Sequence, residues 1–167
     1  TSNLIAEERM DEFKALVQKS YDFIFALAMP LMVGLIFTSP SAVLLLSGEG
    51  FVPAILTSQI VAFNILTVGL SGVMGIQVLY PLGKINIVIL CTSIGAIINV
   101  FLNVLLIPRY GHNGTAVAYM LAEMTVTVSM FFIGKRYIPI RFLKRQHLNY
   151  VLGSVVMGVC LYFISCL

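Results

Sequence analysis

The amino-acid sequence predicts an all-α membrane protein, a helical bundle of five transmembrane spans. Two observations carry this prediction. Of the 167 residues, 59% are hydrophobic and only 10% are charged, which is far outside the composition of soluble domains. The charged residues gather in a few short segments between long uncharged runs, and about 20 apolar residues in a helix are enough to cross a hydrocarbon core about 30 Å thick.

Each predicted span is an apolar run of this kind. The spans are residues 23–46, 54–80, 85–107, 115–134 and 151–167. Only the fourth span contains a charged residue, Glu123, and the fifth is the shortest because the chain stops at Leu167. The chain also starts at Thr1 without a signal-peptide pattern. We therefore expect the sequence to be a piece of a longer polypeptide.

The segment before the first span, residues 1–22, is expected to form a unit distinct from the bundle of residues 23–167. Its polar residues recur at helical spacing, at Glu7, Asp11, Lys14 and Gln18. Its apolar residues form the adjacent face, at Ala6, Met10, Phe13 and Val17. This pattern predicts a cytoplasmic amphipathic or linker helix that lies along the membrane surface or against the bundle.

Two prolines, Pro30 and Pro40, lie inside the first span. Each removes a backbone donor and favours a kink, whose freed carbonyl must be satisfied by a neighbouring helix or by a Ser or Thr hydroxyl. A bent helix can act as a gate in a transporter. Proline is also common in membrane helices for packing reasons alone, so both interpretations stay open.

Four polar residues inside the spans are candidates for a substrate-facing cavity: Asn64, Asn99, Asn103 and Glu123. Asn99 and Asn103 are four residues apart and share a helical face, which is expected to point into the bundle, either as hydrogen-bonding glue or as part of a wet cavity. A charged Glu123 would cost a few kcal/mol inside a membrane unless paired or neutral. We expect Glu123 to face the interior, to exchange protons or to bond Asn99 or Asn103, or to be a protonated structural residue.

The basic residues divide unequally between the two ends of the spans. One end carries nine of the ten, and Arg109 stands alone at the other. The positive-inside tendency places the first end in the cytoplasm and the loops 47–53 and 108–114 outside. The cytoplasmic basic residues nearest the bundle are Lys84, Lys135, Arg136, Arg141, Lys144 and Arg145. They are expected to anchor the protein to anionic lipid or to contact a diphosphate head group, and not to bind nucleic acid.

The sequence lacks the residue groupings of an enzyme or a metalloprotein. The three cysteines form no CxxC pair, and the two histidines fall in segments on opposite sides of the membrane. We find neither paired carboxylates nor a nucleophile with a nearby base. The sequence therefore predicts a protein without catalytic residues, metal or cofactor.

Three phrases of the sequence resemble the C-terminal half of polysaccharide flippases in the multidrug/oligosaccharidyl-lipid/polysaccharide exporter superfamily. They are GEGFVPA (residues 48–54), GLSGVMGIQVLYPLGK (69–84) and CTSIGAIINVFLNVLLIPRYGHNGTAVAYMLAE (91–123). In physical terms their glycines and prolines permit tight turns and mark the ends of helices. The resemblance covers about residues 21–137.

The resemblance implies two six-helix lobes around a central cavity that opens alternately to either side of the cell membrane. The chain would supply part of the second lobe, with the N-terminal half of the same transporter as its partner. The implied function is flipping of a polyprenyl-diphosphate-linked oligosaccharide across the cytoplasmic membrane for capsule or other surface-polysaccharide assembly. Alternatives are a multidrug or lipid-linked peptidoglycan precursor exporter of the same superfamily, a membrane-embedded envelope-assembly enzyme and a structural anchor.

Overall fold

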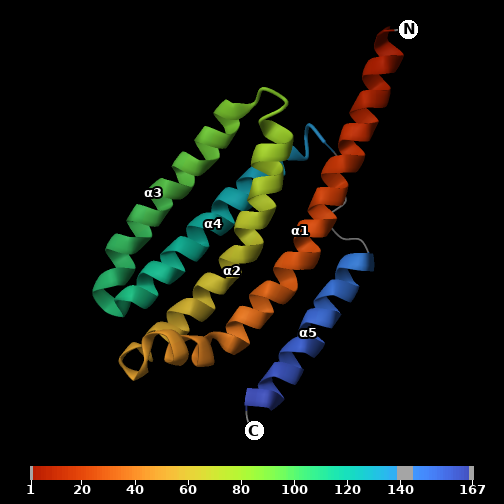
Figure 1. Cartoon of the computed structure of the whole chain (residues 1–167). Coiled ribbons are helices and arrows are strands. Elements are labelled where there is room, and N and C mark those ends of the chain that lie inside the picture. The colour runs from red at the N-terminus through yellow and green to blue at the C-terminus, as the bar shows by residue number, and fades with distance from the viewer. Residues whose placement is uncertain (1, 139–144, 166–167) are drawn as a thin grey trace.

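The computed structural model describes residues 2–138 and 145–165, and every regular element in these ranges is a helix (Figure 1). The elements are α1 (Ser2–Ser47), η1 (Glu49–Phe51), α2 (Ala54–Gly72), η2 (Val73–Leu79), α3 (Ile85–Tyr110), α4 (His112–Gly134) and α5 (Arg145–Ser165). The predicted all-α membrane bundle is confirmed.

Four of the described helical stretches are long and apolar enough to cross a bilayer. They lie at Met10–Ser47, Ala54–Leu79, Ile85–Tyr110 and His112–Gly134. The apolar stretch of α5, His147–Phe163, is shorter. Large apolar side chains cover much of the outer surface of these helices, as expected for a bundle whose outer face meets lipid tails.

The helices are arranged side by side in the order α5, α1, α2, α4 and α3 (Figure 1). The helix α4 packs against both α2 and α3, while α3 meets the second span mainly at η2. A cluster of buried apolar side chains joins α1, η2, α3, α4 and the segment after α4; its members are Val17, Tyr21, Val73, Met74, Val78, Cys91, Val126, Met130 and Ile138. This core holds together the end of the bundle at which α4 terminates.

The first helix is continuous from the segment before the predicted span into the span itself, without a break at residue 22. Val17 and Tyr21 are almost fully buried in the core cluster, and Phe13 packs against it. In this part of α1 the predicted apolar face therefore lies against the bundle. The N-terminal end of α1 projects past the other helices (Figure 1).

Pro30 and Pro40 both lie within α1, which continues through them. Proline at position 40 cannot donate to the carbonyl of Ile36, the acceptor of a regular helix at that point. Two side chains replace the missing donor: the Ser39 hydroxyl donates to the Ile36 carbonyl at 3.2 Å, and the Gln59 amide of α2 donates to it at 3.1 Å. The kink site at Pro40 is thus also a link between α1 and α2.

In each of the three described turns between the spans, a glycine with a positive φ angle lies at a position predicted from the sequence. Gly48 and Gly83 have positive φ angles and lie in the predicted turns 47–53 and 81–84. The predicted extent of the outward loop, residues 108–114, is wrong. The helix α3 continues through Pro108 to Tyr110, and α4 begins at His112. Gly111, with a φ of 54°, reverses the chain alone, a conformation that side-chain-bearing residues seldom adopt.

The helix α5 begins within the segment that the sequence predicts to lie outside the spans, and His147 is buried against α1. Its exposed fraction is 2%, and its Nε2 lies 3.1 Å from Asp22 Oδ1. Gln18 donates to the same oxygen at 2.8 Å. The rings of Tyr21, Phe25 and Tyr150 surround the imidazole. A polar contact enclosed by aromatic rings therefore joins α5 to α1.

Candidate functional site

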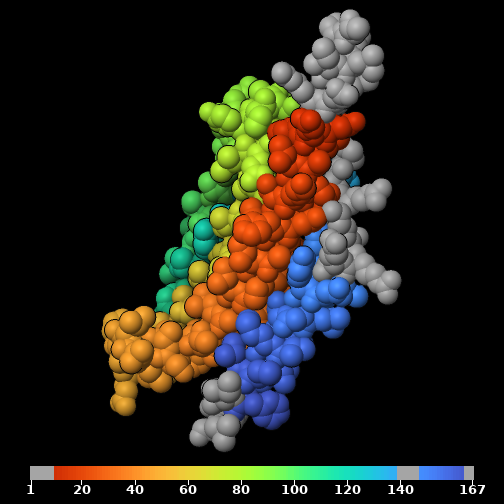
Figure 2. All heavy atoms as spheres, turned by 45° about the vertical axis from the view of Figure 1, so that its right-hand side comes forward, coloured from red at the N-terminus to blue at the C-terminus, as the bar shows by residue number. Residues whose placement is uncertain are grey.

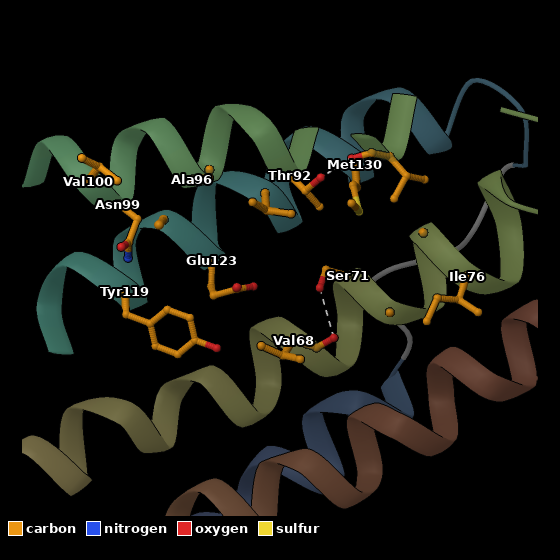
Figure 3. Close-up of a pocket in the computed structure, with 16 residues that line it drawn as sticks. Val68, Ser71, Ile76, Thr92, Ala96, Asn99, Val100, Tyr119, Glu123 and Met130 are labelled. Carbon is orange, nitrogen blue, oxygen red and sulfur yellow. Dashed lines mark hydrogen bonds between the residues drawn. The ribbon is translucent and has the colours of Figure 1, made fainter. Parts of the chain in front are cut away.

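A cavity of about 600 Å³ lies between α2–η2, α3 and α4 (Figure 3). Most of its wall is apolar. Its polar side chains are Ser71, Thr92, Asn99, Tyr119 and Glu123. The described residues that line it include one carboxylate and no Lys, Arg or His. The cavity thus offers hydrogen-bond acceptors and a phenol within an apolar surface, which is the usual makeup of a small-molecule site.

Small residues allow the helices to form this cavity while packing closely behind it. Gly95 and Ala122 bring α3 against α4, and a Cβ atom at Gly95 would overlap the side chain of Val126. On the other wall, Gly72 and Gly75 flank the start of η2. This π-helical segment is wound more widely than an α-helix, a distortion that is frequent at functional sites.

Glu123 projects from α4 into the cavity (Figure 3). Tyr119 lies one helical turn before it and also lines the cavity. The predicted hydrogen bond from Glu123 to Asn99 or Asn103 is not among the contacts of the described residues. The carboxylate instead faces the open space of the cavity, where it is available to a ligand or a proton.

Asn99 and Asn103 bond to each other along α3. The Asn103 amide donates to the Asn99 side-chain oxygen and to the Asn99 carbonyl, both at 2.9 Å. Asn99 lines the main cavity, and both residues line a hollow of about 360 Å³ that adjoins it on α3. The Asn103 side-chain oxygen is buried and has no partner in the described part of the chain. This pair therefore extends the polar wall along α3 and does not link two helices.

Asn64 does not line the cavity. It is almost fully buried in α2, and its amide nitrogen has no hydrogen-bond partner among the described residues. Its position four and seven residues before Val68 and Ser71, which do line the cavity, places it on the same side of α2. Of the four candidates, the structure thus brings Asn99, Asn103 and Glu123 to one surface and leaves Asn64 one turn away.

Threonine hydroxyl groups link α4 to α2 beside the cavity. The Thr127 hydroxyl of α4 lies 2.9 Å from the Thr67 carbonyl of α2 and 2.8 Å from the Glu123 carbonyl of its own helix. Near the other end of these helices, Thr57 donates to the Asn113 side chain at 2.7 Å. These two contacts fix α4 against α2, and so fix the position from which Glu123 projects.

Three polar residues of the cavity wall, Tyr119, Ser71 and Thr92, are not among the predicted site residues. Tyr119 carried a usable signal, because a residue four positions before Glu123 shares its helical face. Ser71 and Thr92 carried a similar signal, because they lie seven residues after Asn64 and seven residues before Asn99. Both hydroxyls donate to carbonyls of their own helices, as such groups do throughout membrane proteins.

The basic residues lie apart from the cavity. Lys84, Lys135 and Arg136 are exposed at the end of the bundle where η2 and α4 terminate. Arg141 and Lys144 lie outside the described residues, and Arg145 begins α5. No group of three or more His, Cys, Asp or Glu side chains that could hold a metal occurs within residues 2–138 and 145–165.

Several apolar helices around a partly polar interhelical cavity define a multi-pass membrane protein of the transporter kind. A family model described as "Lipid II flippase MurJ" matches residues 1–167. The chain belongs to this family, and it is therefore a flippase-type protein of the cell membrane. No curated protein and no solved structure gives a match. The expected superfamily is confirmed by this result, whereas the polysaccharide branch of it is not.

Proposed function

We propose that this chain takes part in moving a lipid-linked peptidoglycan precursor from the cytoplasmic to the outer leaflet of the cell membrane. The observation that carries the proposal is the family match over the whole chain, and the interhelical cavity with Glu123 and Asn99 supports it. The match favours the peptidoglycan precursor over the oligosaccharide that the sequence resemblance implies, although both are carried on a polyprenyl diphosphate.

The chemistry of the cavity suits the sugar and peptide portion of such a substrate. Sugar hydroxyls and amide N–H groups donate hydrogen bonds, and Glu123 and Asn99 present acceptors to them. A diphosphate needs cations or backbone donors, which the described lining residues do not offer. We therefore assign the uncharged head-group atoms to this cavity and the diphosphate to residues outside it.

The movement follows from the two-lobe architecture that the resemblance implies. The helices described in this chain belong to one lobe, and the N-terminal half of the transporter is the proposed partner lobe. Rocking of one lobe against the other would expose the cavity first to one side and then to the other, while the lipid tail stays in the bilayer. In this scheme Glu123 is the candidate proton or ion carrier, and the bent α1 with Pro30 and Pro40 is the candidate gate.

Binding by the purified chain tests the proposal and separates the two candidate substrates. We expect the lipid-linked disaccharide-pentapeptide to bind at least tenfold more tightly than a polyprenyl diphosphate carrying a plain oligosaccharide. Replacing Glu123 with Gln should weaken precursor binding about tenfold, because a hydrogen bond to a charged group is worth about 1.5–3 kcal/mol. The matched control is Glu49→Gln, at an exposed carboxylate of η1, which should change nothing.

Two results would contradict the proposal. Equal binding of the peptidoglycan precursor and the plain oligosaccharide lipid would remove the preference for the peptidoglycan substrate. Unchanged precursor binding by Glu123→Gln would show that the Glu123 carboxylate in the cavity takes no part in recognising the head group.

A further inference from the structure

Three exposed cations gather at the end of the bundle where the second and fourth spans terminate. Lys84 ends the turn between η2 and α3, and Lys135 and Arg136 directly follow α4 (Figure 1). The Lys84 ammonium lies 5.7 Å from the centre of the Tyr137 ring, which brings the turn next to the segment after α4. The three cations therefore form one group, named here the basic end cluster.

Aromatic rings, and not carboxylates, lie beside these cations. The Lys135 ammonium is 4.5 Å from the centre of the Phe132 ring, and Lys84 lies over Tyr137. In the described part of the chain no Asp or Glu contacts Lys84, Lys135 or Arg136. Lys14 of α1 differs, because it is paired with Asp11 at 2.8 Å. The charge of the basic end cluster is thus not balanced by the described protein groups.

The position of the cluster indicates which anion would balance it. The apolar stretches Ala54–Leu79, Ile85–Tyr110 and His112–Gly134 all begin or end beside these residues, so the cations lie where the hydrocarbon core gives way to head groups. Tyr137, Phe132 and Tyr80 are exposed there too, as aromatic side chains are at membrane interfaces. The anion that is present at this depth everywhere in the membrane is the phosphate of a lipid head group.

The backbone holds the cluster together. Gly83 donates to the Tyr80 carbonyl at 3.0 Å and Lys84 donates to the Leu79 carbonyl at 2.8 Å, which fixes the turn. Ile138 is fully buried in the core cluster, which anchors the segment after α4. Both sources of charge are therefore carried by ordered backbone and do not depend on a loose loop.

We propose that the basic end cluster, Lys84 with Lys135 and Arg136, is a binding site for the phosphate group of an anionic glycerophospholipid. The aromatic rings of Tyr137 and Phe132 hold the two lysine side chains in place and pack beside the upper part of the lipid's acyl chains. This site is separate from the cavity of Glu123, and the proposal holds whichever lipid-linked substrate the cavity accepts.

The test is a titration of tail-labelled phosphatidylglycerol into the full chain in neutral detergent micelles, followed by fluorescence anisotropy. Replacing all three cations with Gln should raise the dissociation constant more than tenfold, since each Lys or Arg near such a head group contributes about a fivefold factor. Labelled phosphatidylcholine should bind weakly to every variant. The triple Lys84→Arg, Lys135→Arg and Arg136→Lys variant should bind phosphatidylglycerol like the native chain.

Two control variants separate a site from general electrostatic attraction. Arg109→Gln removes an exposed cation from the opposite end, and Lys14→Gln removes one that is already paired; each should change the dissociation constant less than twofold. An equal loss with Arg109→Gln, or an unchanged constant in the triple Gln variant, would overturn the proposal. Displacement of phosphatidylglycerol by farnesyl diphosphate at far lower concentration would overturn it as well, because the site would then serve a diphosphate.

Discussion

Pro40 leaves the carbonyl of Ile36 without its helical donor, and the repair comes from another span. Gln59 of α2 donates to this oxygen at 3.1 Å. A carbonyl inside a membrane protein cannot turn to water, so the replacement donor matters more here than on a soluble surface. The sequence predicts that some hydroxyl or neighbouring helix must supply it, but nothing in the order of residues identifies Gln59, which lies 23 positions away.

Gln59→Leu should lower the free energy of unfolding by about 1 kcal/mol, the usual size of a hydrogen bond between membrane helices. Unfolding of the chain in detergent, followed by circular dichroism, measures the change. The control is Gln77→Leu, another amide of the second span, for which no hydrogen bond occurs among the described residues. Equal losses in the two variants would show that the amide of Gln59 has no special role at the Pro40 site.

Among the candidate site residues, helical spacing predicts a shared face for Asn99 and Asn103, and the cost of a charge inside a membrane predicts that Glu123 faces the interior. Spacing along the sequence does not identify the hydrogen-bond partner of each side chain. Asn103 bonds to Asn99 within α3, a contact available to any Asn pair four residues apart, whereas a bond to Glu123 depends on how α3 and α4 are rotated. That rotation is set by Gly95 and its neighbours, and a single sequence does not display it.

At the level of elements, apolar runs and glycines predicted α2 with η2, α3 and α4 to within about three residues at each end, and the remaining differences have local causes. Pro108 was read as the start of a loop, yet a proline in the last turn of a helix removes a single hydrogen bond and does not have to end the helix. The π-helical segment η2 (Val73–Leu79) was not predicted, because its apolar residues continue the run of the second span and do not distinguish a π-helix from an α-helix.

The contact between α5 and α1 can be tested by replacing Asp22 and His147 singly and together. Replacing Asp22 with Asn or His147 with Phe should each lower the free energy of unfolding by about 1–3 kcal/mol, because each weakens or removes a hydrogen bond between the Asp22 carboxylate and the almost fully buried His147 imidazole. The double variant should lose at least 0.5 kcal/mol less than the sum of the two, as expected for residues in direct contact. Denaturation of the four proteins in the same detergent provides this comparison. Strict additivity would mean that the 3.1 Å contact contributes nothing of its own.

For the whole molecule, the predicted orientation in the membrane can be tested by labelling. In a chain whose native cysteines are replaced by Ala, a cysteine at His112 should react with a membrane-impermeant maleimide added outside intact cells. A cysteine at Arg136 should react only after the cells are opened. Both positions are exposed in the structure, so the reverse pattern would invert the proposed topology and the direction of transport with it.

Figure 2 shows α5 lying along α1 on the side of the molecule turned away from α3 and α4. The lining of the cavity of Glu123 comes from α2, η2, α3 and α4 alone, and α1 and α5 contribute nothing to it. Three adjacent helical segments form an open groove and do not enclose a channel. A head group bound in this groove keeps one side uncovered, so complete shielding from the hydrocarbon requires a surface that these five helices do not supply.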